Sequence, residues 1–244
     1  MAICITGGSS GIGRAIAERF AGPGVEVFIN YHADDEAAGE AAAAIAARGG
    51  EPHLIKADIG TAEGIGAIVE AVGAVTDRLD QLVHAAGMAI SGRLIDLDAA
   101  TLDRAVAVNG TSFGHLVREA LPLLGEGSSV FFVTSAGSTR ALPNYGALGA
   151  PKALAEHLAR YLASELAPRG IRVNCISPGP LDTTARRRMF PDTWEERLEQ
   201  QVAATPGGRA LTFEDVAGVV ELMAHEDFRM TFGQVVTIDG GLTL

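Results

Sequence analysis

The first thirteen residues constrain the fold more than any other part of the chain. Ala2–Thr6 is a short, mostly apolar run, which is typical of a strand buried on both faces of a sheet. A glycine-rich turn, Thr6–Gly13, follows it, and apolar residues then recur with helical spacing from about Gly11 to Gly22. This order predicts a strand, a tight turn and a helix, the opening unit of an α/β chain.

The same alternation continues to the C-terminus. Six further strand-like runs are Val25–Asn30, His53–Asp58, Leu79–Ala85, Ser129–Thr134, Arg172–Ser177 and Val235–Ile238. Segments with helical spacing separate them, and we expect one long helix over Asp98–Leu124. We therefore predict an α/β fold in which residues 1–244 form a single doubly wound domain. Its seven-stranded parallel sheet carries helices on both faces.

Composition and charge exclude several classes of protein. Apolar residues make up 48% of the 244 residues, and the net charge of −11 argues against a nucleic-acid partner. No apolar run is long enough to span a membrane, and no signal-peptide pattern follows Met1, so we expect a cytoplasmic protein. Cys4 and Cys175 lie in apolar runs, which predicts free buried thiols and no metal site.

The glycine-rich turn predicts a phosphate site. Glycines allow a tight turn and a close approach of the backbone to a pyrophosphate, and the following helix offers free N–H groups to the anion. In the first strand–turn–helix unit of an α/β chain, this combination indicates a dinucleotide cofactor. The residues that we expect to contact the cofactor here are Gly7, Ser9, Ser10, Gly11, Ile12 and Gly13.

The spacing of this turn, Thr-Gly-x3-Gly-x-Gly, resembles that of the short-chain dehydrogenase/reductase family. Other motifs follow in the family's order over essentially the whole chain: Asp58, Asn109 in a Val-Asn-Gly run, Ser135, Lys152, and Pro178–Thr183 as Pro-Gly-x3-Thr. The resemblance implies a Rossmann fold, an NAD(P)-dependent oxidoreductase with a small-molecule substrate, and a homodimer or homotetramer.

The resemblance also implies where the rest of the cofactor lies. In the family, the end of the third strand holds the adenine, the turn after the fourth strand borders the cofactor, and the Pro-Gly-x3-Thr segment borders the nicotinamide. The positions concerned are Asp58, Ile59, Ala85, Ala86, Gly87, Pro178, Gly179 and Thr183. Lys152 is expected to bind the ribose.

The end of the second strand favours NADPH over NADH. An acidic residue usually binds the ribose 2′-hydroxyl of NAD at this point, whereas this chain has Asn30, Tyr31 and His32. Ser9, Ser10, Asn30 and His32 offer hydrogen bonds to a 2′-phosphate. Against this, no Arg or Lys stands near and acidic residues 34–36 follow closely. His32 is equally well explained as an ordinary surface histidine.

The chain departs from the family at its catalytic tyrosine. The family places this tyrosine four residues before the lysine and thirteen after the serine, and both counts reach Leu148. In the family, the tyrosine donates a proton to the carbonyl oxygen, the serine polarises that oxygen, and the lysine lowers the tyrosine pKa. Ser135, Lys152 and Asn109 remain as expected catalytic residues. The usual Asn-Asn-Ala-Gly turn is also altered and begins with His84. Two roles are open for His84, a structural one and that of a proton donor.

Tyr145 stands seven residues before Lys152, a spacing similar to that of enoyl-acyl-carrier-protein reductases of the family. The similarity is partial, because Ser135 occupies the place of their second tyrosine. Tyr145 is thus expected to act as a proton donor or oxyanion stabiliser, or to line the substrate pocket. Pro151 predicts that the helix begins there and that Tyr145 lies on a loop before it.

Three functions remain open at this point. The first is NADPH-dependent reduction of a ketone in an aromatic polyketide, with a phenol of the substrate as proton donor. The chain resembles a ketoreductase of angucyclinone biosynthesis in lacking the usual tyrosine. The second is reduction of an enoyl thioester with Tyr145 and Lys152. The third is an NADP(H)-binding sensor or partner protein with little turnover.

The charged segment of about 183–208 is where the family carries its substrate lid. Arg186–Arg188 could meet an acyl-carrier protein or an acidic substrate. The simpler interpretation is a solvated helix face paired with Glu195, Glu196 and Glu199. Phe190 and Trp194 would pack over a substrate or seal the lid, and Ser91 is a further candidate for the pocket wall.

Overall fold

Seven parallel strands in the order β3-β2-β1-β4-β5-β6-β7 form one sheet in the computed structural model, which describes residues 1–244. The strands are β1 (Ala2–Thr6), β2 (Glu26–Tyr31), β3 (Glu51–Lys56), β4 (Leu79–His84), β5 (Leu124–Val133), β6 (Arg172–Pro178) and β7 (Val235–Ile238). The strand order reverses between β1 and β4, which leaves a crevice at their carboxyl ends. The predicted seven-stranded parallel sheet is confirmed.

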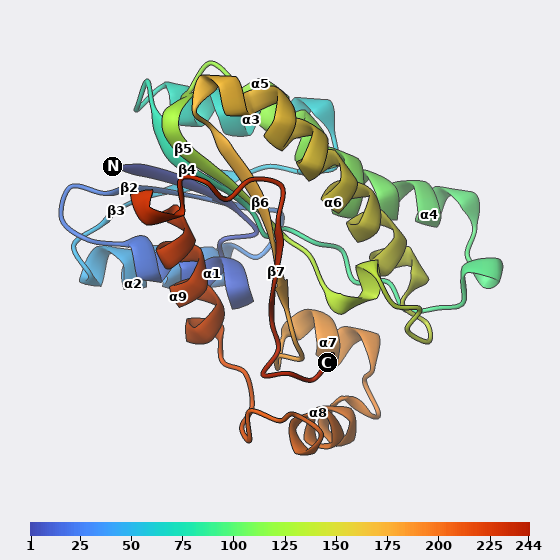
Figure 1. Ribbon diagram of the computed structural model, residues 1–244. Helices are drawn as coiled ribbons and strands as arrows, with labels where there is room; N and C mark the ends of the chain where they lie inside the picture. The colour runs from blue at the N-terminus through green and yellow to red at the C-terminus, as the bar shows by residue number, and fades with distance from the viewer.

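Helices cover both faces of the sheet (Figure 1). One face carries α1 (Gly11–Phe20), α2 (Asp35–Ala47) and α9 (Phe213–Ala224), and the other carries α3 (Ala62–Gly73), α4 (Ala99–Val106), α5 (Ser112–Ala120) and α6 (Gly146–Leu166). Two short helices, α7 (Thr184–Met189) and α8 (Trp194–Ala203), lie apart from both layers, beyond the carboxyl end of β6. No helix is long and apolar enough to cross a membrane.

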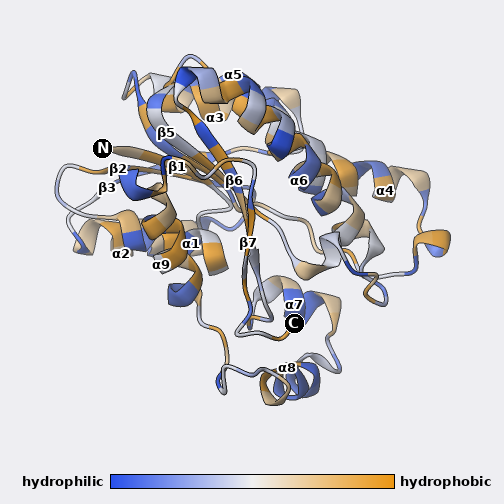
Figure 2. Ribbon diagram, in the orientation of Figure 1, coloured by the Kyte–Doolittle hydropathy of each residue, from blue (hydrophilic) through white to orange (hydrophobic).

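Two apolar clusters form the core, one on each side of the sheet. Neighbouring residues of β5 contribute to both, because successive side chains of a strand point to opposite faces. Phe132 packs with Phe113 in the cluster beneath α3, α5 and α6, whereas Phe131 belongs to the cluster beneath α1 and α9. Figure 2 shows apolar residues along the strands between the two helical layers. This double burial explains why the strands appear as continuous apolar runs in the sequence.

The structure corrects two predicted helices. The expected helix over Asp98–Leu124 is divided by a π-helical turn at Ala107–Thr111 and ends at Ala120, and β5 begins as early as Leu124. The turn carries Asn109, whose side chain bonds outside the helix, and such bulges are frequent at functional sites.

Helix α6 begins at Gly146 and not at Pro151. The carbonyl of Tyr145 accepts bonds from the N–H groups of Leu148 and Gly149, so a complete turn forms before Pro151 is reached. The proline removes only its own N–H donor, and the helix continues through it. Position 148 is therefore presented from a regular helix.

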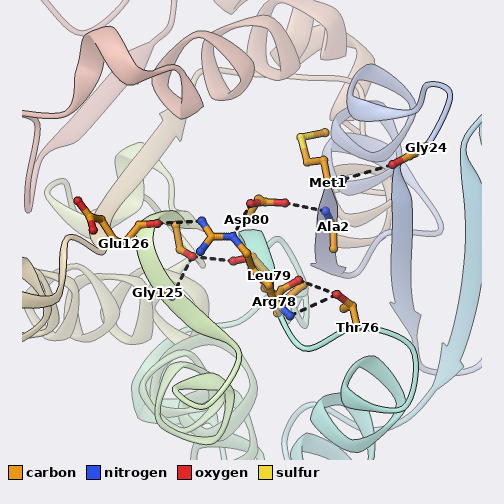
Figure 3. Close-up of polar contacts among 10 residues, drawn as sticks. Met1, Ala2, Gly24, Thr76, Arg78, Leu79, Asp80, Gly125 and Glu126 are labelled. Carbon is orange, nitrogen blue, oxygen red and sulfur yellow. Dashed lines mark hydrogen bonds and ion pairs between the residues drawn. The ribbon is translucent and has the colours of Figure 1, made fainter.

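Polar contacts hold the amino ends of the central strands together (Figure 3). The Arg78 guanidinium donates to the Asp80 carboxylate at 2.9 Å and to the Glu126 carbonyl at 2.8 Å. The second oxygen of Asp80 accepts the Ala2 N–H at 2.9 Å. These bonds join the starts of β1, β4 and β5, at the edge of the sheet opposite to the carboxyl ends of the strands.

Arg172 provides a test of how α9 is fixed to the sheet. It is 4% exposed and donates to the carbonyls of Met223, Ala224 and Phe228 and to the Ser129 hydroxyl. Arg172→Met leaves these acceptors without a partner, so we expect a loss of about 3 kcal/mol or more in the free energy of unfolding. Urea denaturation measures this loss. Exposed Arg229→Met is the control, and equal stability of the two variants would contradict this assignment.

Candidate active site

The glycine turn between β1 and α1 fits the pyrophosphate of a dinucleotide. Gly7 has φ of +67°, and a Cβ there would lie 2.7 Å from the Ala86 Cα. A Cβ at Gly13 would collide with the Gly7 carbonyl. The first i to i−4 bond of α1 is that of Arg14 N–H to Ser10, and the Ser10 side chain makes no cap. The N–H groups of Gly11–Gly13 are therefore available to an anion.

The end of β2 differs from what we expected for a 2′-phosphate site. The Asn30 amide is buried and donates to the carbonyls of Ile55 at 3.2 Å and Ala57 at 3.0 Å. It ties β2 to β3 and is not free to bind a phosphate, because these acceptors take up its donor hydrogens. The Tyr31 hydroxyl donates to Asp35 at 2.8 Å. His32 is exposed, so His32, Ser9 and Ser10 are the remaining candidates.

Asp58, the expected adenine residue, forms an ion pair that sequence reasoning missed. Arg104 of α4 donates to both carboxylate oxygens at 2.6 Å, and the Gly60 N–H donates at 2.9 Å. Burial alone would raise the pKa of Asp58, but these bonds hold it below its usual value. Arg104 stands 46 residues away, so no local pattern signals the pair. Ile59 is buried beside it.

The turn after β4 is fixed from two sides. The N–H groups of Ala85 and Ala86 donate to the backbone and side-chain oxygens of Thr6. Beyond Gly87, the Asn109 side chain accepts the Met88 N–H at 2.8 Å and donates to the Met88 carbonyl at 3.0 Å. Asn109 thus clamps the turn from the π-helical segment, and its side chain acts here on the backbone.

The segment after β6 runs close to the C-terminal turn. A Cβ at Gly179 would lie 2.7 Å from that of Asp239, and the Gly179 N–H donates to Ile238 at 2.8 Å. Thr183 caps α7, because its hydroxyl oxygen accepts the Arg186 N–H at 3.0 Å. The expected nicotinamide edge therefore meets the end of β7 at Gly179 and leads into α7 at Thr183.

Ser135 and Tyr145 are brought together at the carboxyl edge of the sheet. The Tyr145 hydroxyl donates to Ser135 Oγ at 3.3 Å. The ring of Tyr145 packs over Gly137, where any side chain would collide with it. Burial raises the pKa of Tyr145, and the Ser135 bond and the charge of Arg186 partly oppose this. Leu148 is buried in the first turn of α6 and has no acidic proton.

Lys152 points into the protein. Its ammonium group donates to the Val133 carbonyl at 2.6 Å and lies 4.4 Å from the centre of the Phe132 ring. The side chain is 6% exposed, and burial lowers its pKa to about 8. No hydrogen bond joins it to Ser135 or Tyr145. It stands one helical turn beyond Leu148, the position where a tyrosine would otherwise meet it.

His84 is structural and not a proton donor at neutral pH. It is fully buried, and burial lowers its pKa to about 3. Ser112 Oγ lies 2.9 Å from its Nε2 and donates its own proton to the Val108 carbonyl, so Nε2 is the donor toward Ser112. Nδ1 is buried without a partner.

A cavity of about 450 Å³ adjoins Tyr145. The loops after β4 and β5 line it, and its polar wall includes Arg93, Arg140 and Asn144. Ser91 precedes the lining residue Gly92 and does not itself contribute. The structure contains no group of three or more His, Cys, Asp or Glu residues arranged to hold a metal ion.

The arginines of α7 are not paired with Glu195, Glu196 and Glu199 as the simpler interpretation held. Arg187 binds the Asp182 carboxylate through two bonds at 2.8 and 2.6 Å and stacks 4.4 Å over the Trp194 ring. Arg186 donates instead to the Gln201 side chain on α8. The helical register of α7 and α8 decides these partners, and the sequence alone does not fix how two short helices cross.

Comparisons with known proteins show which reductases this chain is similar to. The sequence profile of the family described as Enoyl-(Acyl carrier protein) reductase matches residues 7–243. The 1-cyclohexenylcarbonyl-CoA reductase of Streptomyces collinus is 31% identical over 98% of this chain and 86% of its own. The enoyl-[acyl-carrier-protein] reductase [NADH] 2 of Rhizobium meliloti is 31% identical, over 97% of this chain and 88% of the Rhizobium chain.

A fungal reductase and a solved cofactor complex are also similar to this chain. The tetrahydroxynaphthalene reductase of Pyricularia oryzae is 29% identical over 97% of this chain and 87% of its own. The structure of Pseudomonas aeruginosa RhlG in an NADP active-site complex superposes with a TM-score of 0.88 and 31% identity. It covers 100% of this chain and 96% of that one.

The buried His84 makes the stability depend on pH. Its pKa is about 3 in the folded protein against 6.5 in the unfolded chain, so the unfolded chain binds the proton first as the pH falls from 6.5 toward 3. The fold is stabilised above this window and weakened within it, by about 2 kcal/mol at pH 5. Urea unfolding at pH 7 and pH 5 measures the loss. In His84→Asn, the loss of unfolding free energy between pH 7 and pH 5 should be smaller by about 2 kcal/mol. In the control His115→Asn, which changes an exposed histidine, the loss should be the same as in the parent.

Proposed function

Because the chain belongs to the short-chain dehydrogenase/reductase family and is an NAD(P)H-dependent reductase, we propose that it reduces a ketone of a phenolic aromatic polyketide. One observation carries this proposal. Leu148 lies on the regular first turn of α6, where the family presents its tyrosine, and it offers no proton. A substrate that brings its own acid fits such a site.

The chemistry explains why a phenol is needed. NADPH, when bound, would supply a hydride to the carbonyl carbon, which leaves negative charge on the carbonyl oxygen. Loss of a positioned acid costs about 10² to 10⁴ in rate. A phenol hydrogen-bonded to the ketone donates its proton to that oxygen and becomes a phenolate, which is far less basic than an alkoxide. Ser135 then orients the carbonyl oxygen by a hydrogen bond.

Several features support NADPH as the cofactor. Residues 30–32 at the end of β2 carry no carboxylate, and Ser9, Ser10 and His32 can donate hydrogen bonds to a 2′-phosphate. The similar Pseudomonas protein is described with NADP, whereas the Rhizobium relative is named for NADH. Gly7–Gly13 would hold the pyrophosphate, and residues of about 183–208, which include α7 and α8, would close over the substrate as a lid.

Enoyl-thioester reduction is the second candidate, favoured by the bond between Tyr145 and Ser135. A phenol hydroxyl beside the developing enolate oxygen would stabilise it. The family description and the Streptomyces relative are both named for reduction of enoyl-type substrates. A cofactor-binding sensor is the third, and it would consume no NADPH with either substrate.

The substrate itself distinguishes these candidates. We expect NADPH absorbance to fall with 8-hydroxy-1-tetralone, a ketone with an adjacent phenol, and not with crotonyl-CoA. The methyl ether, 8-methoxy-1-tetralone, should react at least about a hundredfold more slowly, because its proton is gone. Tyr145→Phe should keep most of the ketone activity. Consumption with crotonyl-CoA alone, abolished in Tyr145→Phe, would establish the enoyl reaction and contradict the proposal.

Restoring an acid at position 148 should relieve the need for the phenol. Leu148→Tyr places a hydroxyl on α6 one turn before Lys152, so we expect about tenfold or greater gain in kcat with 8-methoxy-1-tetralone. Leu148→Phe has a similar size without the hydroxyl and is the matched control. Equal rates for the two variants would show that a hydroxyl at position 148 does not donate a proton to the carbonyl oxygen.

A further inference from the structure

The cavity beside Tyr145 has a positively charged wall. Its 13 lining residues include Arg93 and Arg140 and no Asp or Glu. In the whole chain, by contrast, Asp and Glu outnumber Lys and Arg by 30 to 19. None of the residues that we expect to contact the cofactor lines this cavity. The phosphates of NADPH therefore do not account for the two arginines.

The two loops that supply the arginines are fixed to each other and to α6. Gly92, the residue before Arg93 in the loop after β4, donates its N–H to the Asn144 carbonyl of the loop after β5 at 3.2 Å. Leu94 packs on the first residue of α6, because a Cβ at Gly146 would lie 2.5 Å from Leu94 Cγ. The wall of the cavity is thus formed by the protein itself, as is usual for small-molecule sites.

Neither arginine is neutralised by a buried acid. Arg140 donates through one terminal nitrogen to the neutral Thr243 carbonyl at 2.5 Å, which is its one side-chain hydrogen bond. Asp239 lies within range of its charge but bonds instead to the N–H and hydroxyl of Thr243. Arg93 Nε lies 3.4 Å from Asp96, but both side chains are exposed, and such a pair contributes at most about 1 kcal/mol. A guanidinium has five N–H donors, so both arginines can still bind an anion.

Apolar side chains flank the charged part of the wall. Leu94 and Leu142 line the cavity and are both exposed. Ile95, beside Leu94, is 78% exposed. Large apolar side chains exposed together at a cavity are typical of a ligand site. With the arginines, they suit a ligand that has an apolar body and an anionic group.

Tyr145 connects this wall to the reacting groups. It lines the cavity, and its hydroxyl donates to Ser135 Oγ at 3.3 Å. The cavity has a volume of about 450 Å³, which is within the range of sites that hold small molecules. A ketone whose oxygen is held by Ser135 can therefore extend past Tyr145 toward the arginines.

We propose that the substrate is an acidic ketone, whose carboxylate binds Arg140 and Arg93 in this cavity. The proposal rests on the function proposed above and defines its substrate class more closely. Arg140 is the principal partner, because its charge is not paired with a carboxylate. A planar guanidinium matches a carboxylate through two parallel N–H···O bonds. The carboxylate takes no part in hydride transfer, so it contributes to binding.

The first test is a binding measurement with two matched ligands. 8-Hydroxy-1-tetralone-3-carboxylate is ionised at pH 7, and the 3-carboxamide has a similar shape without the charge. Calorimetric titration of the protein with NADP⁺ present should give a Kd about tenfold lower for the acid than for the amide. Raising NaCl from about 50 mM to about 500 mM should reduce this preference, because salt screens exposed charges.

Variants assign the preference to the arginines. Arg140→Gln should reduce it to about twofold or less, and Arg140→Lys, which keeps the charge, should retain part of it. Arg93→Gln should reduce it by a smaller factor of about threefold. Arg229→Gln is the matched control, because Arg229 is exposed and does not line the cavity, and it should bind both ligands as the parent does. The Kd of the carboxamide should be the same in all these proteins.

The second test is kinetic and separates binding from a structural defect. In Arg140→Gln, KM for the acid should rise about fivefold or more while kcat stays the same, because an interaction common to ground state and transition state is lost. Both constants for the carboxamide should stay unchanged. A change in kcat with both ketones would indicate a disturbed site and would contradict a role in binding the carboxylate.

The outcomes separate this proposal from the proposed function. If the parent reduces both ketones but binds acid and amide equally, the carboxylate site is overturned and the ketoreductase function stands. If the acid binds through Arg140 and no NADPH is consumed, the ketoreductase function is overturned while the anion site stands. Coenzyme A is the third ligand, because its phosphates offer the same anionic oxygens. If it binds through Arg140 while acid and amide bind equally, the arginines serve an acyl carrier and the acidic ketone is overturned.

Discussion

The close approach of two turns at the carboxyl ends of β1 and β4 is the constraint on which the site depends. Gly7 adopts a positive φ and leaves no room for a side chain against Ala86. This contact sets the crevice where the strand order reverses, and Asn109 fixes its far side through Met88. These contacts thus fix the glycine turn, the turn after β4 and the π-helical segment relative to one another.

One buried and two half-buried cations distinguish the region of this site from a simple apolar cavity. Lys152 lies inside the protein against a carbonyl and an aromatic ring, so part of its charge is offset by fixed dipoles. Arg186 has only a neutral amide as its partner, and Arg104 is paired with Asp58. Of the three, Arg186 is the one with a buried side-chain nitrogen, Nε, that has no hydrogen-bond partner.

The sequence predicted what is encoded locally and missed what depends on distant partners. The sheet and the glycine turn follow from apolar periodicity and from residues adjacent in the chain, as does the place of Leu148 relative to Lys152. The structural use of Asn30 and the pairing of Asp58 with Arg104 arise between elements far apart in sequence. Pro151 misled because a proline predicts a helix start, although the turn before it was already closed by the Tyr145 carbonyl.

Leu148 has a consequence for how such an enzyme would choose among metabolites. A reductase that carries its own acid can turn over any ketone that fits its cavity. One that borrows the acid from its substrate filters by chemistry, because a ketone without a neighbouring hydroxyl is bound and released unchanged. Selectivity then depends on whether the substrate carries an acidic hydroxyl next to its ketone. Carbonyl compounds without that hydroxyl would act only as weak competitive ligands.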